Sequence, residues 1–113
     1  MVTVVEQDYF KRFFEEDGLK PHVIKFFSDD CGLCHSLAPD YEKISNELQD
    51  SFEFIKIDSG AHLKLSDLLS ASGVPTILLF REGNFYELIY PDDGYDYSYI
   101  KESLIRNKNL KRI

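Results

Sequence analysis

The sequence predicts one α/β domain spanning residues 1–113, in which a central mixed sheet of five strands is flanked by four helices. Short segments rich in β-branched and aromatic residues alternate with longer segments whose apolar residues recur every three or four positions. These patterns are typical of strands and amphipathic helices, and their alternation favours a partly parallel sheet with helices on both faces. The last two strands are joined only by Arg81, Glu82 and Gly83. They must be antiparallel, because a parallel pair needs a long crossover connection.

The predicted elements follow in the order β-α-β-α-β-α-β-β-α. We expect strands at 2–5, 22–27, 52–58, 75–80 and 84–90, and helices at 9–14, 31–48, 65–69 and 95–108. The second helix has the clearest apolar stripe, formed by Leu33, Leu37, Tyr41, Ile44 and Leu48. We interpret these stripes as core.

The composition is that of a globular protein with an acidic surface. Its 113 residues are enough to bury a core without stabilising disulfides or metals, and hydrophobic residues make up 43% of them. Twenty acidic residues against thirteen Lys and Arg give a formal net charge of −7. Such a surface repels nucleic acids and anionic membranes, so neither is an expected partner.

The beginning of the sequence predicts a cytoplasmic protein. The opening residues, "MVTVVEQDYF", lack the basic start of a secretory signal, and no stretch of about 20 apolar residues could span a bilayer. In the reducing cytoplasm, paired cysteines are more often catalytic or metal-binding than structural.

Both cysteines lie in the segment 28–36, "SDDCGLCHS". Their spacing fits a redox dithiol, a c-type haem attachment with His35, or the first part of a zinc site. If Cys31 begins the second helix, the unpaired N–H groups of the helix terminus lower the thiol pKa from about 8.5. Cys34, one turn further on, is close enough for a reversible disulfide, and Gly32 leaves the outer sulfur accessible.

The haem and zinc alternatives have less support. A haem needs a second axial ligand and usually export, and the only methionine is Met1. Zinc needs four ligands, and beyond the cysteines the chain offers only His22, His35 and His62, at no recognised spacing. A cysteine pair without chemistry is also disfavoured, because thiols at a helix start seldom stay inert. The redox dithiol is the favoured interpretation.

The residues around the cysteines resemble the active-site segment of the thioredoxin family. In "HVIKFFSDDCGLCHSLAP", Cys31-Gly32-Leu33-Cys34 replaces the family's Cys-Gly-Pro-Cys, and Pro39 matches its helix-kinking proline. "SGVPTILLF" is similar to the family's cis-proline segment, and "FIKID" to its third strand, with Lys56 at the usual lysine. The resemblance covers nearly the whole chain in the expected order.

The resemblance implies a thioredoxin fold and a thiol–disulfide oxidoreductase that reduces protein disulfides. Cys31 would be the exposed nucleophile, and Cys34 the more buried residue that resolves the mixed disulfide. The redox-active disulfide Cys31–Cys34 would suffice, so no metal or other cofactor is expected. The implied partners are disulfide-containing proteins and an external reductase such as a thioredoxin reductase, and we expect a monomer.

The resemblance also implies a substrate groove. The Val74–Pro75 bond would be cis and pack against the disulfide, and the backbone of Val74 would pair with the substrate as an added strand. Gly94, in the loop 91–94, would lie at the rim of this groove.

Three departures from the family pattern bear on the chemistry. Asp30 replaces the Trp usually found before the first cysteine, and its charge disfavours the Cys31 thiolate. Leu33 replaces the proline of the motif, which loosens the turn. Lys25 stands where the family has a buried Asp; it either stays charged and stabilises a thiolate or loses its charge and acts as a base.

These departures keep a second function open, that of a non-catalytic thioredoxin-fold module that docks on a partner protein. A glutaredoxin is less supported, because the chain lacks that family's Cys-Pro-Tyr-Cys motif and its Gly-Gly after the cis-proline strand.

Overall fold

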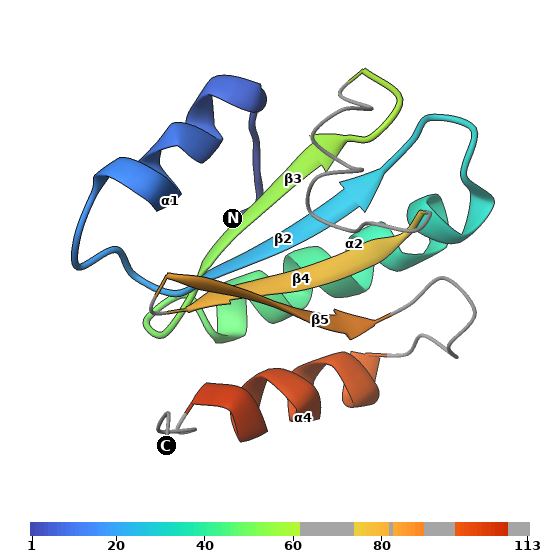
Figure 1. Ribbon diagram of the computed structural model, residues 1–113. Coiled ribbons are helices and arrows are strands. Elements are labelled where there is room, and N and C mark those ends of the chain that lie inside the picture. Colours follow the sequence, from blue (N-terminus) through green and yellow to red (C-terminus); the bar gives the residue numbers. More distant parts are fainter. Residues whose placement is uncertain (62–73, 82, 90–96, 109–113) are drawn as a thin grey trace.

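The computed structural model describes residues 1–61, 74–81, 83–89 and 97–108, which form a five-stranded sheet with helices on both faces (Figure 1). The strands are β1 (Thr3–Val4), β2 (His22–Phe27), β3 (Glu53–Asp58), β4 (Thr76–Arg81) and β5 (Asn84–Ile89). The helices are the 3-10 helix η1 (Gln7–Lys11) and the α-helices α1 (Arg12–Glu15), α2 (Gly32–Glu47) and α4 (Tyr97–Lys108). The helix predicted at 65–69 and the predicted rim residue Gly94 lie outside the described residues.

The strands lie in the order β1-β3-β2-β4-β5. Both β1 and β2 run parallel to β3, whereas β4 pairs antiparallel with β2, and β5 pairs antiparallel with β4. The predicted mixed sheet ending in an antiparallel hairpin is therefore confirmed. Gly83 lies in the connection between β4 and β5 with a φ of 83°, a conformation that residues with a side chain rarely adopt.

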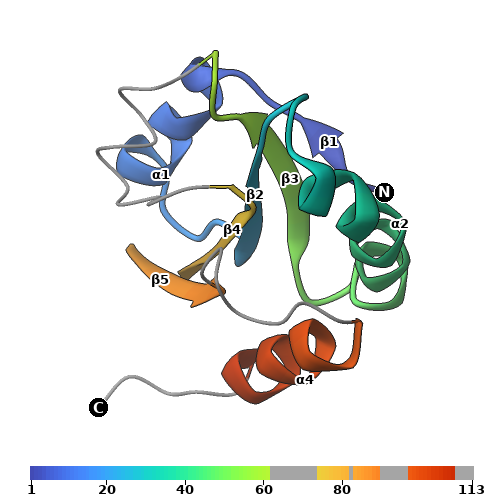
Figure 2. The same ribbon diagram turned by 90° about the vertical axis from the view of Figure 1, so that its right-hand side faces the viewer.

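Each face of the sheet has its own apolar core. Figure 2 shows α1 on one side of the sheet and α2 and α4 on the other. Because strand side chains alternate between the two faces, neighbouring residues of β2 contribute to different cores. Val23 belongs to the cluster that contains Tyr41 of α2 and Leu104 of α4, whereas Ile24 belongs to the cluster with Phe13 of α1.

The first helical segment differs from the single helix predicted at 9–14. It begins as η1 and continues directly into the short α1, which ends where Glu16 becomes extended. Phe10 and Phe13 are buried, while Phe14 is 71% exposed. Residues three apart share one face of a 3-10 helix, so the aromatic spacing predicted a helical segment without distinguishing its type.

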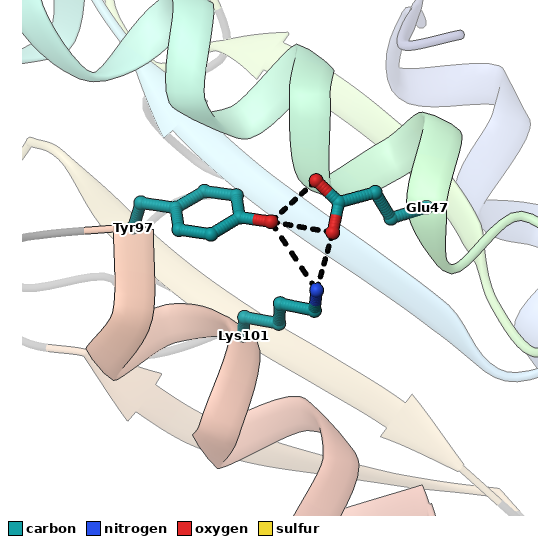
Figure 3. Close-up of polar contacts among 3 residues, drawn as sticks. All are labelled: Glu47, Tyr97 and Lys101. Carbon is teal, nitrogen blue, oxygen red and sulfur yellow. Dashed lines mark hydrogen bonds and ion pairs between the residues drawn. The ribbon is translucent and has the colours of Figure 1, made fainter.

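A cluster of polar side chains connects α4 to the end of α2 (Figure 3). The Tyr97 hydroxyl and the Lys101 ammonium of α4 both donate hydrogen bonds to the Glu47 carboxylate of α2. The Lys43 ammonium lies 4.5 Å from the centre of the Tyr97 ring. Exposed contacts of this kind contribute little individually, so the Ile100 and Leu104 side chains, which are fully buried, hold α4 in place.

Helix α2 is the longest described helix and contains Pro39, as the resemblance implies. It packs one side against the sheet and leaves polar residues on the other. None of the helices within the described ranges has the length and apolarity that a membrane span requires.

Candidate redox site at the start of α2

The two cysteines lie at the start of α2, just after the turn that connects it to β2. Strand β2 ends at Phe27, a turn follows, and Cys31 is the N-cap residue of α2. The Cys31 N–H donates to the carbonyl oxygen of Ser28 over 3.2 Å, which closes this turn. The short turn places Cys31 at the end of the sheet toward which the parallel strands run.

Cys31 and Cys34 form a disulfide, with their Cα atoms 5.2 Å apart. The backbone N–H of Cys34 donates to the Cys31 Sγ over 3.0 Å, so that sulfur occupies the capping position of the helix. Unpaired N–H groups and the helix dipole favour negative charge there. Cys31 is half-buried and Cys34 is only 3% exposed, which matches the predicted outer and inner positions.

The two residues between the cysteines are exposed. A Cβ at Gly32 would meet no atom within 4 Å. Leu33 is 57% exposed, so the prediction that it belongs to the buried apolar stripe of this helix is wrong. Within the described residues, the helix start between the two cysteines therefore presents open space at Gly32 and an apolar side chain at Leu33.

The turn before Cys31 carries two exposed acidic residues, Asp29 and Asp30. The ring of His35 fixes this turn from the helix side, because its Nε2 donates to the carbonyl oxygen of Asp29 over 2.8 Å. This contact gives His35 a structural role in holding the turn.

Lys25 is buried next to the main chain of Cys34. Its side chain is on the α2 side of β2 and is 2% exposed. Its ammonium donates to the carbonyl oxygen of Cys34 over 3.3 Å and lies 5.4 Å from the centre of the Tyr41 ring. Burial, and secondarily the charge of Lys56, lower the pKa of Lys25 to about 8.

A cavity of about 180 Å³ lies beside this lysine. Its lining residues are Lys25, Phe27, Ser28, Asp29, Cys34, His35, Ala38 and Lys56. Lys25 and Lys56 are paired in register on neighbouring strands, and the Lys56 ammonium lies 5.5 Å from the centre of the Phe27 ring. The inner cysteine thus lines a small cavity together with two lysines.

The predicted substrate-binding segment lies at the same end of the sheet. The Val74–Pro75 bond is cis, and β4 begins at the next residue, with Thr76 opposite Phe26 in the antiparallel register. Because Cys31 follows β2 closely, this register places Val74 and Pro75 at the sheet end that carries the cysteines. Pro75 is buried and Val74 half-buried.

Tyr41 has a polar function that its place in the apolar stripe did not predict. Its hydroxyl lies 2.9 Å from the carbonyl oxygen of Ile55 and 3.1 Å from that of Val23, so it shares one proton between β3 and β2. A tyrosine among leucines and isoleucines in a helix stripe was the sequence feature that could have indicated this. The face of the ring also packs against the Lys25 ammonium.

Metal binding gains no support from the described part of the chain. There, no group of three or more His, Cys, Asp or Glu side chains is arranged to hold a metal ion. Zinc requires four such ligands in a structural site.

Comparisons with known proteins agree with this geometry. The sequence matches the family model for thioredoxin over residues 1–99. A thioredoxin of Rickettsia typhi is 34% identical over 83 residues, covering 74% of this chain and 78% of that protein. Human protein disulfide-isomerase A4 is 34% identical over 76 residues, which cover 65% of this chain. The chain spans only 12% of the length of that isomerase.

The fold comparison gives the same result. The crystal structure of a thioredoxin from Malassezia sympodialis superposes with a TM-score of 0.80 at 26% identity, covering 96% of this chain and 91% of that one. The family model, the relatives and the fold agree, and the cysteine pair stands at the family's spacing. The chain therefore belongs to the thioredoxin family.

Proposed function

We propose that this protein is a thiol–disulfide oxidoreductase that reduces disulfides in other proteins through Cys31 and Cys34. The observation that carries the proposal is the unequal placement of the two bonded sulfurs. Cys31 caps α2 and is partly accessible, whereas Cys34 is buried directly behind it. An accessible nucleophile with a protected resolving partner is the arrangement that two-step thiol–disulfide exchange requires.

The reaction starts from the reduced pair. The Cys31 thiolate attacks one sulfur of the substrate disulfide, forms a mixed disulfide and displaces the other substrate sulfur as a thiolate. The Cys34 thiolate then attacks the Cys31 Sγ, so the Cys31–Cys34 bond forms and the mixed disulfide breaks. Two electrons pass to the substrate, and its two thiolates take up the two protons that the cysteines gave up.

Thioredoxins use their own active-site disulfide and need no cofactor. In the proposed cycle an external reductase, such as a thioredoxin reductase, returns two electrons to the Cys31–Cys34 disulfide. The protein would work in this way as a monomer in a reducing cytoplasm, as its sequence predicts.

The substrate polypeptide would bind across the end of the sheet. The position of Val74 and Pro75 at the same end of the sheet as the cysteines supports pairing of the substrate backbone with Val74. The exposed Asp29 and Asp30, together with the net charge of −7, favour substrates with basic residues near their disulfide.

Reduction of insulin by dithiothreitol tests the proposal, because insulin precipitates when its disulfides are reduced. The protein is expected to accelerate precipitation, and Cys31→Ser is expected to abolish the acceleration. The exposed Ser36, one turn into the same helix, provides a matched control, since Ser36→Ala should keep the activity. A protein no faster than dithiothreitol alone would overturn the proposal in favour of a non-catalytic docking module.

A further inference from the structure

Lys25 is a buried cation to which the proposed reaction assigns no role. It lies in the middle of β2, where the neighbouring positions are apolar, and it is as inaccessible as the core. Its hydrogen bond goes to the main chain of Cys34, the inner cysteine. A buried lysine ammonium is costly unless a negative charge balances it.

Among the described residues, the groups that face Lys25 come from β3, β4 and α2. From β3 comes Lys56, opposite in register, and from β4 comes Ile77. From α2 come Cys34 and the Tyr41 ring.

Further away, α4 contributes the apolar Ile100 and Leu104 to this core. His35 and Asp29 line the shared cavity, and both are exposed. The described surroundings of Lys25 thus combine a second cation, a cysteine, apolar or aromatic groups, and the exposed polar residues His35 and Asp29.

The ammonium keeps its charge in the oxidised protein at neutral pH. Burial and Lys56 lower the pKa of Lys25 to about 8, so most molecules carry the proton at pH 7. A buried negative charge that would balance it is missing from the described residues while Cys34 is in the disulfide, because Asp29, the acidic residue that lines the cavity, is exposed. Such a charge forms on reduction, when the Cys34 sulfur becomes a thiol that can ionise.

We propose that Lys25 is a positioning residue that holds the Cys34 sulfur as a thiolate in the reduced protein and thereby raises the midpoint potential of the Cys31–Cys34 couple. The attraction acts only in the reduced state, because the disulfide sulfurs carry no charge. It therefore stabilises the reduced pair relative to the disulfide. It also keeps Cys34 in the nucleophilic form needed to resolve the mixed disulfide. This inference rests on the proposed function for its biological meaning, but its chemistry is measurable separately.

The ionisation of Cys34 is measured in Cys31→Ser, which leaves one thiol. Ultraviolet absorbance of the thiolate against pH gives its pKa with and without Lys25→Met. Loss of the ammonium is expected to raise the Cys34 pKa by about one unit or more. The exposed Lys43 on α2 supplies the matched control, because Lys43→Met removes the same charge away from the cavity.

The redox equilibrium is measured in the otherwise unchanged protein with glutathione. Lys25→Met is expected to shift the equilibrium toward the disulfide by about tenfold, equivalent to roughly 30 mV. Lys25→Arg is expected to restore most of the shift, because it keeps the positive charge and the cavity gives room for the larger group. Rescue by Arg would not occur if the lysine acted only through its packing.

Two results would overturn the inference. One is a Cys34 pKa that stays unchanged or falls in Lys25→Met, which would mean that the lysine acts as a neutral base or not at all. The other is a glutathione equilibrium unaffected by the charge at position 25. Lys25→Gln replaces Lys25→Met in both measurements if the latter does not fold. Failure of insulin reduction with a shifted Cys34 pKa would instead overturn the proposed function alone.

Discussion

The backbone N–H of Cys34 donates a hydrogen bond to the Sγ of Cys31 over 3.0 Å. The outer sulfur thus occupies the helix terminus where a side-chain oxygen usually caps the backbone. This contact connects the fold to the chemistry, because the same N–H that caps α2 would stabilise the Cys31 thiolate after reduction.

The charge of Asp30 opposes this stabilisation. We predict that Asp30→Asn lowers the pKa of Cys31 in the reduced protein and speeds its alkylation by iodoacetamide at pH 7 roughly two- to fivefold. Stopped-flow alkylation against pH measures both quantities. The increase should shrink in high salt, because Asp30 is exposed and its field is screened.

The control for this effect is Asp50→Asn, which removes an exposed acid just beyond the far end of α2. It should leave the alkylation rate unchanged. A Cys31 pKa that rises or stays the same in Asp30→Asn would contradict the prediction and assign the Asp30 carboxylate to partner binding only.

Lys25 should reduce the stability of the oxidised protein. Its pKa is lowered from 10.5 to about 8, so the unfolded chain binds the proton more tightly than the folded one. The resulting cost is fully present below pH 8 and fades as the pH rises from 8 to 10.5. We predict that Lys25→Met stabilises the oxidised protein by about 1–4 kcal/mol at pH 7.

Urea unfolding from pH 7 to pH 10.5 measures this difference, which should decrease as the pH increases. Lys43→Met, which removes an exposed lysine, should change the stability by no more than about 0.5 kcal/mol. A destabilised Lys25→Met protein would show that the hydrogen bond to Cys34 outweighs the cost of burying the charge.

His22 should make the protein sensitive to mild acid. The His22 ring is 2% exposed; its Nδ1 donates to the Lys20 carbonyl oxygen over 2.6 Å, and its Nε2 accepts from the Tyr9 hydroxyl over 2.7 Å. Burial lowers the pKa of His22 below 6.5. The unfolded chain therefore takes up a proton first, and stability should decline as the pH falls through 6.5 toward the folded pKa.

Replacing His22 by Gln should remove this decline, as measured by thermal unfolding between pH 7 and pH 5. The exposed His35 serves as the control, and His35→Gln should keep the decline. Equal pH dependence in wild type and His22→Gln would refute the assignment of the acid sensitivity to His22.

Tyr41→Phe tests the hydroxyl that links two strands. The substitution keeps the ring near Lys25 and removes the hydroxyl that donates to the carbonyl oxygens of Ile55 and Val23. Because the group is buried, we predict a loss of about 1–2 kcal/mol. Tyr86→Phe, at a position 40% exposed, should have no measurable effect on urea unfolding. A neutral Tyr41→Phe would mean that the strand carbonyls are satisfied without it.

The sequence was sufficient for the parts of the fold that depend on local patterns. The period-two and period-three-to-four repeats located the strands and α2, and the short connection at Gly83 required an antiparallel pair. The 3-10 geometry of η1 was not predictable, because the spacing of Phe10 and Phe13 fits both helix types. The cytoplasmic location and the monomeric state stay predictions.

The chemistry of the site was only partly predictable. The spacing of Cys31 and Cys34 and their place at the helix start predicted the disulfide and the deeper burial of Cys34. The surroundings of Lys25 were not predictable from local patterns, because they depend on how β3 and α2 pack against β2. Pairing with Lys56 and contact with Tyr41 exist only after these elements pack.

Trapping a substrate on Cys34→Ser tests the central claim most directly. The variant, reduced and mixed with a disulfide-containing protein, should accumulate a covalent adduct on Cys31 that mass spectrometry detects and dithiothreitol releases. Wild type should show almost none, because Cys34 resolves the intermediate. An adduct on Cys34 in Cys31→Ser of equal yield, or no adduct on Cys34→Ser, would contradict the assignment of Cys31 as nucleophile and Cys34 as resolving residue.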